Sequence, residues 1–278
     1  MYKKYTKKQT VLLLCGALAA AVIVAVLLLI ICSQGEKTPV LAVSDDPYAL
    51  LEKNTYDKSA FFEENGLKNY RFKDGVKALV GIDVSEHQED IDWSALSGKI
   101  DFAFIRVGYR GYEYGLLNPD DRLHDNISGA LKAKIPVGVY FFSQAISEDE
   151  AVAEAKYVID SIKDYNVTWP VVYDMERLEN ARAEALSAEE RTRFAGVFCS
   201  EIKKAGYTPL IYGNVNWLLY EIDMPSLKSY GFWLAEYDDV PEFPYNFDIW
   251  QYTDTGKIPG VEGNFDLNVS FKDFGKAE

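Results

Sequence analysis

The stretch "WPVVYDMERLE", residues 169–179, carries an apolar segment of the β type directly into two carboxylates. Alternate residues of a strand point to the same face, so Asp174 and Glu176 should face the same way, with Cα atoms roughly 6.6 Å apart at about 3.3 Å of rise per residue. Like charges this close raise the cost of ionising each other, which favours a functional pair. The alternative is a solvated strand end.

Seven more short apolar runs of the β type occur in the chain. Together with residues 169–176 they are 79–85, 102–109, 136–143, 208–214, 231–237, 247–253 and 264–270. Between them, residues 147–165 and 187–206 have helical periodicity and helix-capping residues. Strands that alternate with helices predict a parallel sheet, and eight such strands predict a closed barrel.

The last two connections are too short for that plan. Nine residues separate Tyr237 from Phe247, and ten separate Thr253 from Asn264. A parallel crossover normally needs about a dozen residues or more. We therefore predict an α/β fold, an irregular TIM-like barrel with eight strands and fewer than eight helices, in which one late strand can run antiparallel.

Acidic residues recur at the ends of these runs. Asp83 lies in the first run, Asp174 and Glu176 in the fourth, and Asp266 in the eighth. Barrels of this type carry their chemistry at the C-terminal ends of the strands. The first and eighth strands are neighbours in a closed barrel and the fourth lies across its mouth, so these carboxylates should converge on one cleft. This convergence favours the functional interpretation of residues 174 and 176 over the solvated strand end.

The composition narrows the class of partner. The chain has 278 residues with a net charge of −14, and its first 32 residues contribute four lysines and no acid, so the remainder carries −18. A surface this acidic repels phosphate backbones, which argues against nucleic acid as a partner. Tyrosine is abundant, with 19 copies, and sugar-binding clefts favour such flat faces with a polar edge. With only two histidines, His87 and His124, and no phosphate-binding glycine loop, we expect neither a metal nor a cofactor. His87 is expected at the surface, with the rim of the cleft as the alternative.

The N-terminus is basic and then apolar, with 22 uncharged residues from Val11 to Cys32. As a helix this segment spans about 33 Å, enough to cross a bilayer. We predict an uncleaved signal anchor, with residues 1–10 in the cytoplasm, 11–32 as a transmembrane helix and the rest of the chain outside the cell membrane. A cleaved signal peptide that releases a secreted protein is the alternative.

Residues 33–76 bridge this helix and the barrel. Their first part is polar and rich in turn formers, which is typical of a linker. Asn65-Gly66 and Asp74-Gly75 are hairpin-turn dipeptides, and they predict a small β-hairpin near the start of the main domain at 77–275.

Seven motifs, in order along residues 79–271, resemble those of glycoside hydrolase family 25, the muramidases of the Chalaropsis-lysozyme type. They are "GIDVSEHQEDIDW", "NISGALKAKIPVGVYFFS", "VVYDMER", "LIYGN", "WLAEY", "IWQYT" and "NFDLN". Phe141 departs from the pattern, because it stands where the family usually has histidine. The departure suggests a change in a sugar subsite or in the surroundings of the catalytic acid.

The resemblance implies a peptidoglycan hydrolase that cleaves the β-1,4 bond between N-acetylmuramic acid and N-acetylglucosamine, and the N-terminal segment would anchor it in the membrane. Glu176 would be the general acid, and Asp174 would hold the 2-acetamido group of the substrate or act as nucleophile. Asp83 and Asp266 would complete the acidic cleft. The apolar cleft and the charge of Asp174 are expected to raise the pKa of Glu176 and keep it protonated. The spacing of the pair leaves the stereochemistry open, and the family favours retention with help from the acetamido group.

Polar and aromatic residues near the strand ends are the candidates for binding sugar: Tyr140, Tyr173, Tyr212, Trp233, Gln251 and Tyr252. For each aromatic residue, packing in the core is the alternative. The expected partners are peptidoglycan glycan strands and the cell membrane, and the protein is expected to be monomeric.

Two other functions fit parts of the pattern. A chitinase-like hydrolase of N-acetylglucosamine polymers also ends a strand in Asp-x-Glu, but that class has a further Asp where this chain has Val172. A non-catalytic, membrane-tethered wall-binding protein would be marked by loss of Asp174 or Glu176, and both are present.

Overall fold

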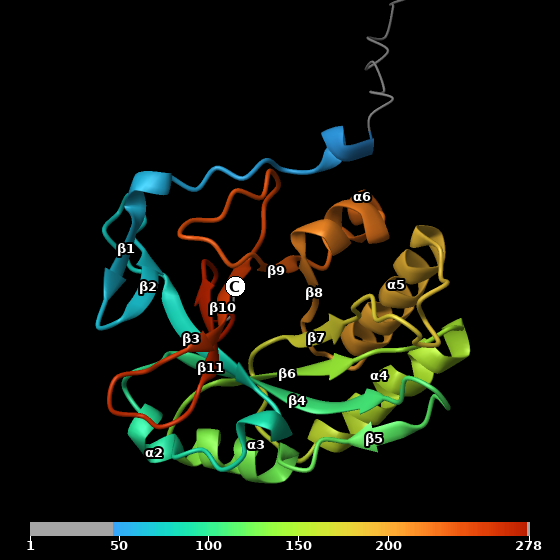
Figure 1. Ribbon diagram of the computed structural model, residues 1–278, viewed down its shortest axis with the longest axis horizontal. Helices are drawn as coiled ribbons and strands as arrows, with labels where there is room; N and C mark the ends of the chain where they lie inside the picture. Colours follow the sequence, from blue (N-terminus) through green and yellow to red (C-terminus); the bar gives the residue numbers. More distant parts are fainter. Residues whose placement is uncertain (1–46, 277–278) are drawn as a thin grey trace, which may run out of the picture. The chain divides into compact units, whose positions relative to one another are not determined.

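The computed structural model describes residues 47–276. Within this range eight strands close into a barrel (Figure 1). They are β3 (Leu79–Val84), β4 (Phe102–Arg110), β6 (Val137–Phe142), β7 (Val171–Asp174), β8 (Pro209–Asn214), β9 (Phe232–Ala235), β10 (Ile249–Gly256) and β11 (Phe265–Ser270). Strand β3 pairs with both β4 and β11, which completes the ring. A short strand, β5 (Leu117–Pro119), adds to β4 at the rim. Each of the eight predicted runs contains or overlaps one barrel strand, so the predicted barrel is confirmed.

The barrel is irregular where the short connections predicted it. Strand β11 runs antiparallel to both of its neighbours, β10 and β3, whereas the pairs from β3 through β4, β6, β7, β8 and β9 to β10 are parallel. No described helix lies between β9 and β10 or between β10 and β11. Strand β11 returns antiparallel beside β10, and such a return needs no crossover helix, which is why so few residues join these two strands. The parallel connection from β9 to β10 instead crosses over as an irregular segment, residues 236–248.

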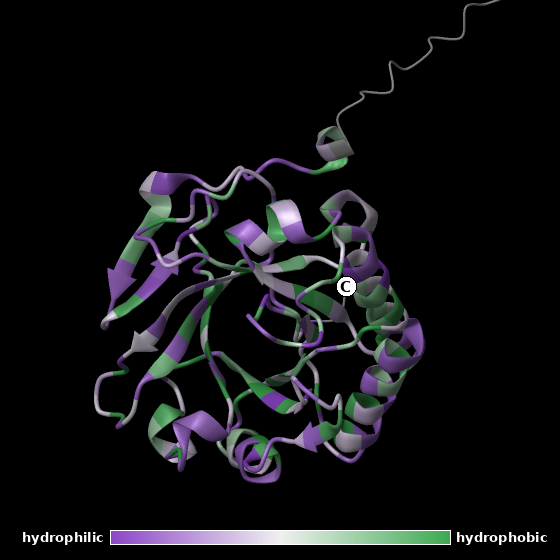
Figure 2. Cartoon of the chain, turned by 45° about the vertical axis from the view of Figure 1, so that its right-hand side comes forward, coloured by the Kyte–Doolittle hydropathy of each residue, from purple (hydrophilic) through white to green (hydrophobic). Residues whose placement is uncertain are grey.

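Three long helices cover the outside of the strands: α3 (Leu123–Lys132), α4 (Glu148–Ile162) and α5 (Ala188–Lys204). Helix α4 begins at the N-cap Ser147, and α5 begins at a capping box formed by Ser187 and Glu190. Figure 2 shows both hydrophilic and hydrophobic residues along these helices, as expected when one face of a helix is buried. The shorter helical elements are α2 (Trp93–Leu96), α6 (Met224–Leu227), η1 (Pro47–Leu50), η2 (Lys58–Ala60), η3 (Glu86–Gln88) and η4 (Trp217–Glu221).

Aromatic side chains fill the barrel interior. The Phe104 ring stacks on Trp233, with centroids 4.7 Å apart, and the Phe102 ring stacks on Trp169 at 4.1 Å. All four side chains are buried. They close the barrel below its mouth, so polar groups that point inward near the strand ends lie above an apolar floor.

The segment before the barrel is packed against it from residue 47 onward. Tyr56 donates its hydroxyl to the Phe247 carbonyl at 2.8 Å, and the Asn54 amide bonds the Phe243 carbonyl at 2.9 Å. A hairpin of β1 (Phe61–Glu64) and β2 (Leu67–Tyr70) follows. Its turn is Asn65-Gly66, and both residues have positive φ (53° and 78°), the geometry of a tight hairpin turn.

The predicted basic tail 1–10, the transmembrane helix 11–32 and the first part of the linker lie outside the described residues. Among residues 47–276, no helix has the length and apolar character needed to cross a membrane.

Candidate active site

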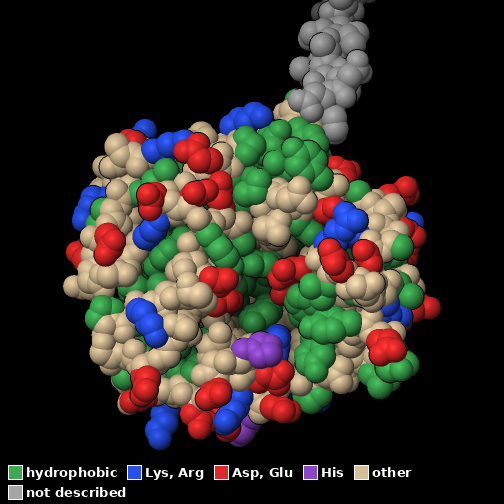
Figure 3. Space-filling view, in the orientation of Figure 1, with side chains coloured by type: hydrophobic (Ala, Val, Ile, Leu, Met, Phe, Trp, Pro, Cys, Tyr) green, Lys and Arg blue, Asp and Glu red, His purple; other side chains and the backbone are tan. Residues whose placement is uncertain are grey.

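A cleft of about 230 Å³ opens at the end of the barrel where the parallel strands terminate. Figure 3 shows a hollow in this face with carboxylates and a histidine around it. The cleft is lined by Asp83, Ser85, His87, Gln88, Arg106, Tyr112, Tyr140, Phe142, Asp174, Glu176, Tyr212, Trp233, Gln251 and Asp266. The four carboxylates expected to converge therefore do so.

Asp266 lies at the opposite end of its strand from the one expected, although it does line the cleft. The sequence suggested the C-terminal end of the eighth strand, but Asp266 is the second residue of β11, near its N-terminal end. Because β11 runs antiparallel to β3, its start lies at the same mouth as the ends of the parallel strands. The register places Asp266 directly opposite Asp83.

Asp83 is the centre of a buried hydrogen-bond network. Its Oδ2 accepts from Gln251 Nε2 at 2.9 Å and from Asn268 Nδ2 at 2.7 Å. The amide oxygen of Gln251 accepts in turn from the Tyr212 hydroxyl at 2.9 Å, and that of Asn268 accepts from Trp233 Nε1 at 2.9 Å. These donors fix Asp83 and oppose the effect of burial, which nevertheless raises its pKa.

Asp266 holds a proton beside Asp83. Burial, and then the charge of Asp83, raise the pKa of Asp266 to about 9. Two carboxyl groups in contact cannot both ionise cheaply, whereas one charge and one proton can share the site. Since Asp83 receives the amide donors, it is the member that carries the charge.

Asp174 and Glu176 line the cleft from the end of β7, as the i, i+2 spacing predicted. Asp174 is buried, and no described residue offers a hydrogen bond to its Oδ1. Burial and the charges of Glu176 and Asp83 raise its pKa well above its ordinary value, while Arg106 opposes the shift. A buried acceptor without a partner is costly, so its presence needs an explanation such as a ligand donor.

Glu176 has the raised pKa that was expected of it, but one cause differs. Burial raises the pKa of Glu176 first, and the charge that adds to the shift comes from Asp83. The expected source was Asp174, whose own raised pKa favours its neutral form.

Four of the six residues proposed to bind sugar line the cleft: Tyr140, Tyr212, Trp233 and Gln251. The tyrosine rings meet Trp233 edge-on, with centroids 6.5 Å away for Tyr140 and 5.1 Å for Tyr212. The two tyrosine rings thus lie at the bottom of the cleft, in contact with Trp233 of the apolar floor.

The structure places Tyr173 and Tyr252 outside the cleft, which corrects that part of the prediction. Tyr173 is fully buried, with its hydroxyl near Ser143 Oγ at 3.2 Å and its ring against Phe198 of α5. The Tyr252 hydroxyl accepts from the Lys68 amide of the hairpin at 3.2 Å. Each follows or precedes an inward-pointing residue in its strand, so the alternation of the strand sends it outward.

The same alternation places Phe141 away from the cleft, so the change expected there from its replacement of histidine does not occur. Its side chain is fully buried on the outer side of β6, with its ring centroid 5.8 Å from that of Tyr157 in α4. It therefore does not line the cleft that holds Asp174 and Glu176.

His87 is exposed, as expected, and it also lines the rim of the cleft, which was the alternative.

Arg106 was not predicted from the sequence as a residue of the cleft, but it lines the cleft. Arg106 points inward from β4, and its guanidinium donates to Asp120 Oδ2 at 2.8 Å and to Glu86 Oε1 at 2.9 Å. A single arginine within the apolar run "FAFIRVGY" was the signal, since an arginine in a strand interior needs buried acidic partners.

Comparison with known proteins gives consistent matches. Residues 82–261 match the family described as Glycosyl hydrolases family 25. The chain is 30% identical over 206 residues to Lysozyme M1 of Streptomyces globisporus, covering 69% of this chain and 68% of that protein.

Two solved structures are also similar. One is the modular autolysin LytC of Streptococcus pneumoniae in complex with a synthetic peptidoglycan ligand, at 25% identity and a TM-score of 0.63. The match covers 76% of this chain and 52% of LytC, so the chain spans about half the length of that autolysin. The other is the bacterial lysozyme of Streptomyces coelicolor, at 26% identity and a TM-score of 0.55, covering 70% of this chain and 93% of that one.

Proposed function

This chain belongs to glycosyl hydrolases family 25, and we propose that it is a muramidase, which hydrolyses the β-1,4 bond between N-acetylmuramic acid and N-acetylglucosamine in peptidoglycan. The family and the enzyme class expected from the sequence motifs, a glycoside hydrolase of the lysozyme type, are confirmed. The assignment of the bond and of the residue roles is supported by one arrangement above all. Asp174 and Glu176 face one cleft, and a buried oxygen of Asp174 has no partner among the described residues.

Glu176 acts as the general acid. Cleavage of a glycoside needs a protonated carboxyl at the leaving oxygen, and burial together with the charge of Asp83 keeps Glu176 protonated to higher pH than an exposed glutamate. As the C1–O bond breaks, the Glu176 proton moves to the departing oxygen. Glu176 then serves as the base that takes a proton from the water attacking C1.

Asp174 stabilises the positive charge that develops at C1. Its Oδ1 is free to accept a hydrogen bond from the N–H of the 2-acetamido group. A donor at that oxygen favours the charged form of Asp174, and the proton of the pair then resides on Glu176. The acetamido oxygen can attack C1, which gives retention of configuration. In the alternative form of the mechanism Asp174 itself attacks C1.

Asp83 and Asp266 prepare the cleft for this reaction. Asp83 is held by the amides of Gln251 and Asn268 and contributes the charge that raises the pKa of Glu176. Asp266 stays protonated at neutral pH and shares its proton with the charged Asp83, and its other oxygen can accept a hydrogen bond from a sugar hydroxyl. Every group of the site comes from one chain, and we therefore propose that the enzyme acts as a monomer.

We also propose that the enzyme works outside the cell membrane, anchored by residues 11–32. Twenty-two uncharged residues behind four lysines support this location, and peptidoglycan strands lie on that side. The full-length protein should stay with membranes after carbonate washing. A mature N-terminus between Ser33 and Pro39 would instead indicate cleavage and release.

Purified peptidoglycan and chitin test the function side by side. The wild-type protein should clear a peptidoglycan suspension and leave chitin intact. Mass analysis of the released fragments should show reducing ends of N-acetylmuramic acid. Glu176→Gln keeps the shape of the side chain but cannot donate a proton, so the rate should fall about 10²- to 10⁴-fold. Reducing ends of N-acetylglucosamine, or a variant with more than half of wild-type turnover, would contradict the assignment.

A further inference from the structure

The cleft continues toward one exposed aromatic residue outside the reaction centre. Its volume of about 230 Å³ is smaller than the roughly 300–1,000 Å³ of ordinary ligand pockets, so a polymeric glycan must extend beyond it. Tyr112 lines the cleft, yet half of the residue is exposed. It belongs to the loop of residues 111–116 between β4 and β5, which we call the 111–116 loop.

We propose that Tyr112 is a platform on which a sugar ring of the glycan strand stacks, next to the catalytic carboxylates. The proposal rests on the function proposed above and adds a binding subsite to it. Stacking on a tyrosine suits a pyranose ring, because one face of the sugar is apolar while its edge is polar. Continuity with the cleft identifies the occupant as the glycan rather than another partner.

Neighbouring aromatic rings orient Tyr112. Its ring is inclined by 28° to that of Tyr109 with centroids 6.2 Å apart, and it meets Phe142 edge-on at 6.1 Å. Phe142 also lines the cleft, and the Arg106 guanidinium lies 5.5 Å from the Tyr109 centroid. A row of rings thus leads from the inner wall to the rim.

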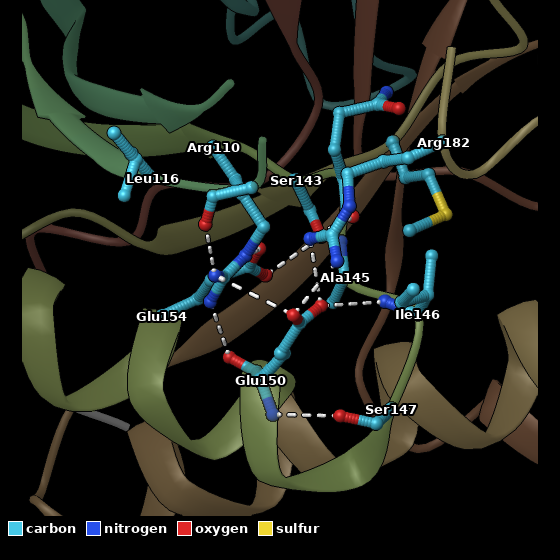
Figure 4. Close-up of polar contacts among 12 residues, drawn as sticks. Arg110, Leu116, Ser143, Ala145, Ile146, Ser147, Glu150, Glu154 and Arg182 are labelled. Atoms are coloured by element: carbon cyan, nitrogen blue, oxygen red, sulfur yellow. Dashed lines mark hydrogen bonds and ion pairs between the residues drawn. The ribbon is translucent and has the colours of Figure 1, made fainter. Parts of the chain in front are cut away.

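Two ion pairs, one buried and one partly exposed, support the loop (Figure 4). The Arg182 guanidinium binds both carboxylate oxygens of Glu150, at 2.9 and 2.8 Å, and the Arg182 backbone N–H donates to the Tyr112 carbonyl at 2.9 Å. Arg110 donates to the Gly115 carbonyl at 2.6 Å and to Glu154 Oε1 at 2.6 Å. The loop is therefore fixed from below by two arginines that are themselves paired.

The Arg182 guanidinium packs so closely against the loop that only glycine fits at position 115. Its φ of +68° is in the left-handed region, and a Cβ at this position would lie 2.3 Å from Arg182 Nη1. A larger residue would displace the arginine or the loop. Arg182 also lies in the connection that follows Glu176, so one residue, through its backbone N–H on Tyr112 and its guanidinium beside Gly115, ties the 111–116 loop to the segment of Glu176.

The same loop offers a matched control in Tyr114. It is 79% exposed, more than Tyr112, and it does not line the cleft. If aromatic surface on the loop were enough to bind glycan, both tyrosines would matter. If the position beside the cleft decides, only Tyr112 will.

The test measures binding by titration calorimetry in the Glu176→Gln background, which prevents turnover. The probe is the peptide-free tetrasaccharide of two N-acetylglucosamine–N-acetylmuramic acid units. Adding Tyr112→Ala should weaken binding about 10-fold, the loss of one good aromatic contact, whereas Tyr114→Ala should leave it unchanged. Tyr112→Trp, which keeps an aromatic face, should retain binding, and circular dichroism checks that each variant is folded.

The supporting role of Arg182 is tested by a double-mutant cycle. Arg182→Lys keeps the charge but cannot form the two-pronged contact with Glu150, so it should weaken tetrasaccharide binding when Tyr112 is present. In the Tyr112→Ala background the same change should have no further effect. Equal losses in both backgrounds would mean that Arg182 acts on the fold in general, and would overturn the positioning role.

The outcomes separate this proposal from the proposed reaction. Unchanged binding in Tyr112→Ala overturns the subsite whatever the activity of the wild type. Binding that depends on Tyr112 only when the probe carries a stem peptide also overturns it, because the occupant is then the peptide. Binding that depends on Tyr112 together with a wild type that fails to cleave peptidoglycan would keep the subsite and reject the muramidase. No binding of the tetrasaccharide by the Glu176→Gln parent would overturn the subsite, while the clearing of peptidoglycan by the wild type decides the muramidase separately.

Discussion

Asp83 of β3 and Asp266 of β11 are register partners across an antiparallel strand pair, and together they hold one charge and one proton at the mouth of the barrel. Amide donors from Gln251 and Asn268 select Asp83 as the charged member. That charge is also the one that adds to the raised pKa of Glu176. The protonation state of Glu176, the proposed general acid, therefore depends on a carboxylate that lies on another strand.

Asp83→Asn should move the basic limb of the pH–rate profile to lower pH. A general acid works while protonated, so activity falls as the pH rises through its pKa, and removing a like charge lowers that pKa. Asp266 could then ionise and compensate in part, so the double variant Asp83→Asn, Asp266→Asn should show the larger shift. Asp266→Asn alone keeps the charge of Asp83 and is the control. A basic limb that stays in place in the double variant would contradict the role of Asp83.

Asp174→Asn should lower activity and at the same time stabilise the fold. Removing the charge that faces the developing cation should cost about 10²-fold or more in rate. The pKa of Asp174 is raised in the folded state. Its contribution to the free energy of unfolding is therefore fully present below about pH 4, the ordinary carboxyl value, and is lost as the pH rises toward the folded-state pKa. The melting temperature of Asp174→Asn should thus exceed that of the wild type at pH 7, and the two should converge near pH 4. A lower melting temperature at pH 7 would contradict this account.

Gln251→Ala and Tyr252→Phe test the alternation of β10 with adjacent residues. The Gln251 amide donates to Asp83, so its loss should lower activity and disturb the pH profile. Tyr252 faces the hairpin, so Tyr252→Phe should leave kcat and KM at their wild-type values. An increased KM in Tyr252→Phe would return this tyrosine to the substrate site.

Glu154→Gln should destabilise the protein strongly. Glu154 is fully buried and pairs with Arg110, and the change leaves the buried arginine with only its longer contact to Glu150, at 3.9 Å, so the loss should approach about 3–5 kcal/mol. Asp160→Asn removes an exposed pair with Lys163 and should change stability by less than about 0.5 kcal/mol. Urea unfolding of the two variants measures the contrast. Similar small losses would mean that the Glu154–Arg110 pair contributes little.

Particular residues explain why the strands and helix α5 could be predicted from the sequence and why two tyrosines could not be placed correctly. The eight strands were visible because each is a short apolar run, and α5 was visible because Ser187 and Glu190 form a capping box. The shared face of Asp174 and Glu176 followed from the two-residue period of a strand. The same period, applied to Tyr173 and Tyr252, would have excluded both from the cleft.

The sequence by itself determined the barrel, its family and the placement of Asp174 and Glu176 at one cleft, because these depend on local periodicity and on motifs that are contiguous in the chain. Only the tertiary structure decided which groups act on that pair. The antiparallel course of β11 brings Asp266 beside Asp83, and the closure of the barrel brings the charge of Asp83 to Glu176. The support of the 111–116 loop by Arg182 likewise joins residues about 70 positions apart in the chain. Electrostatic and hydrogen-bond energies depend on distance in space and on burial, and neither quantity is encoded in any single stretch of the chain.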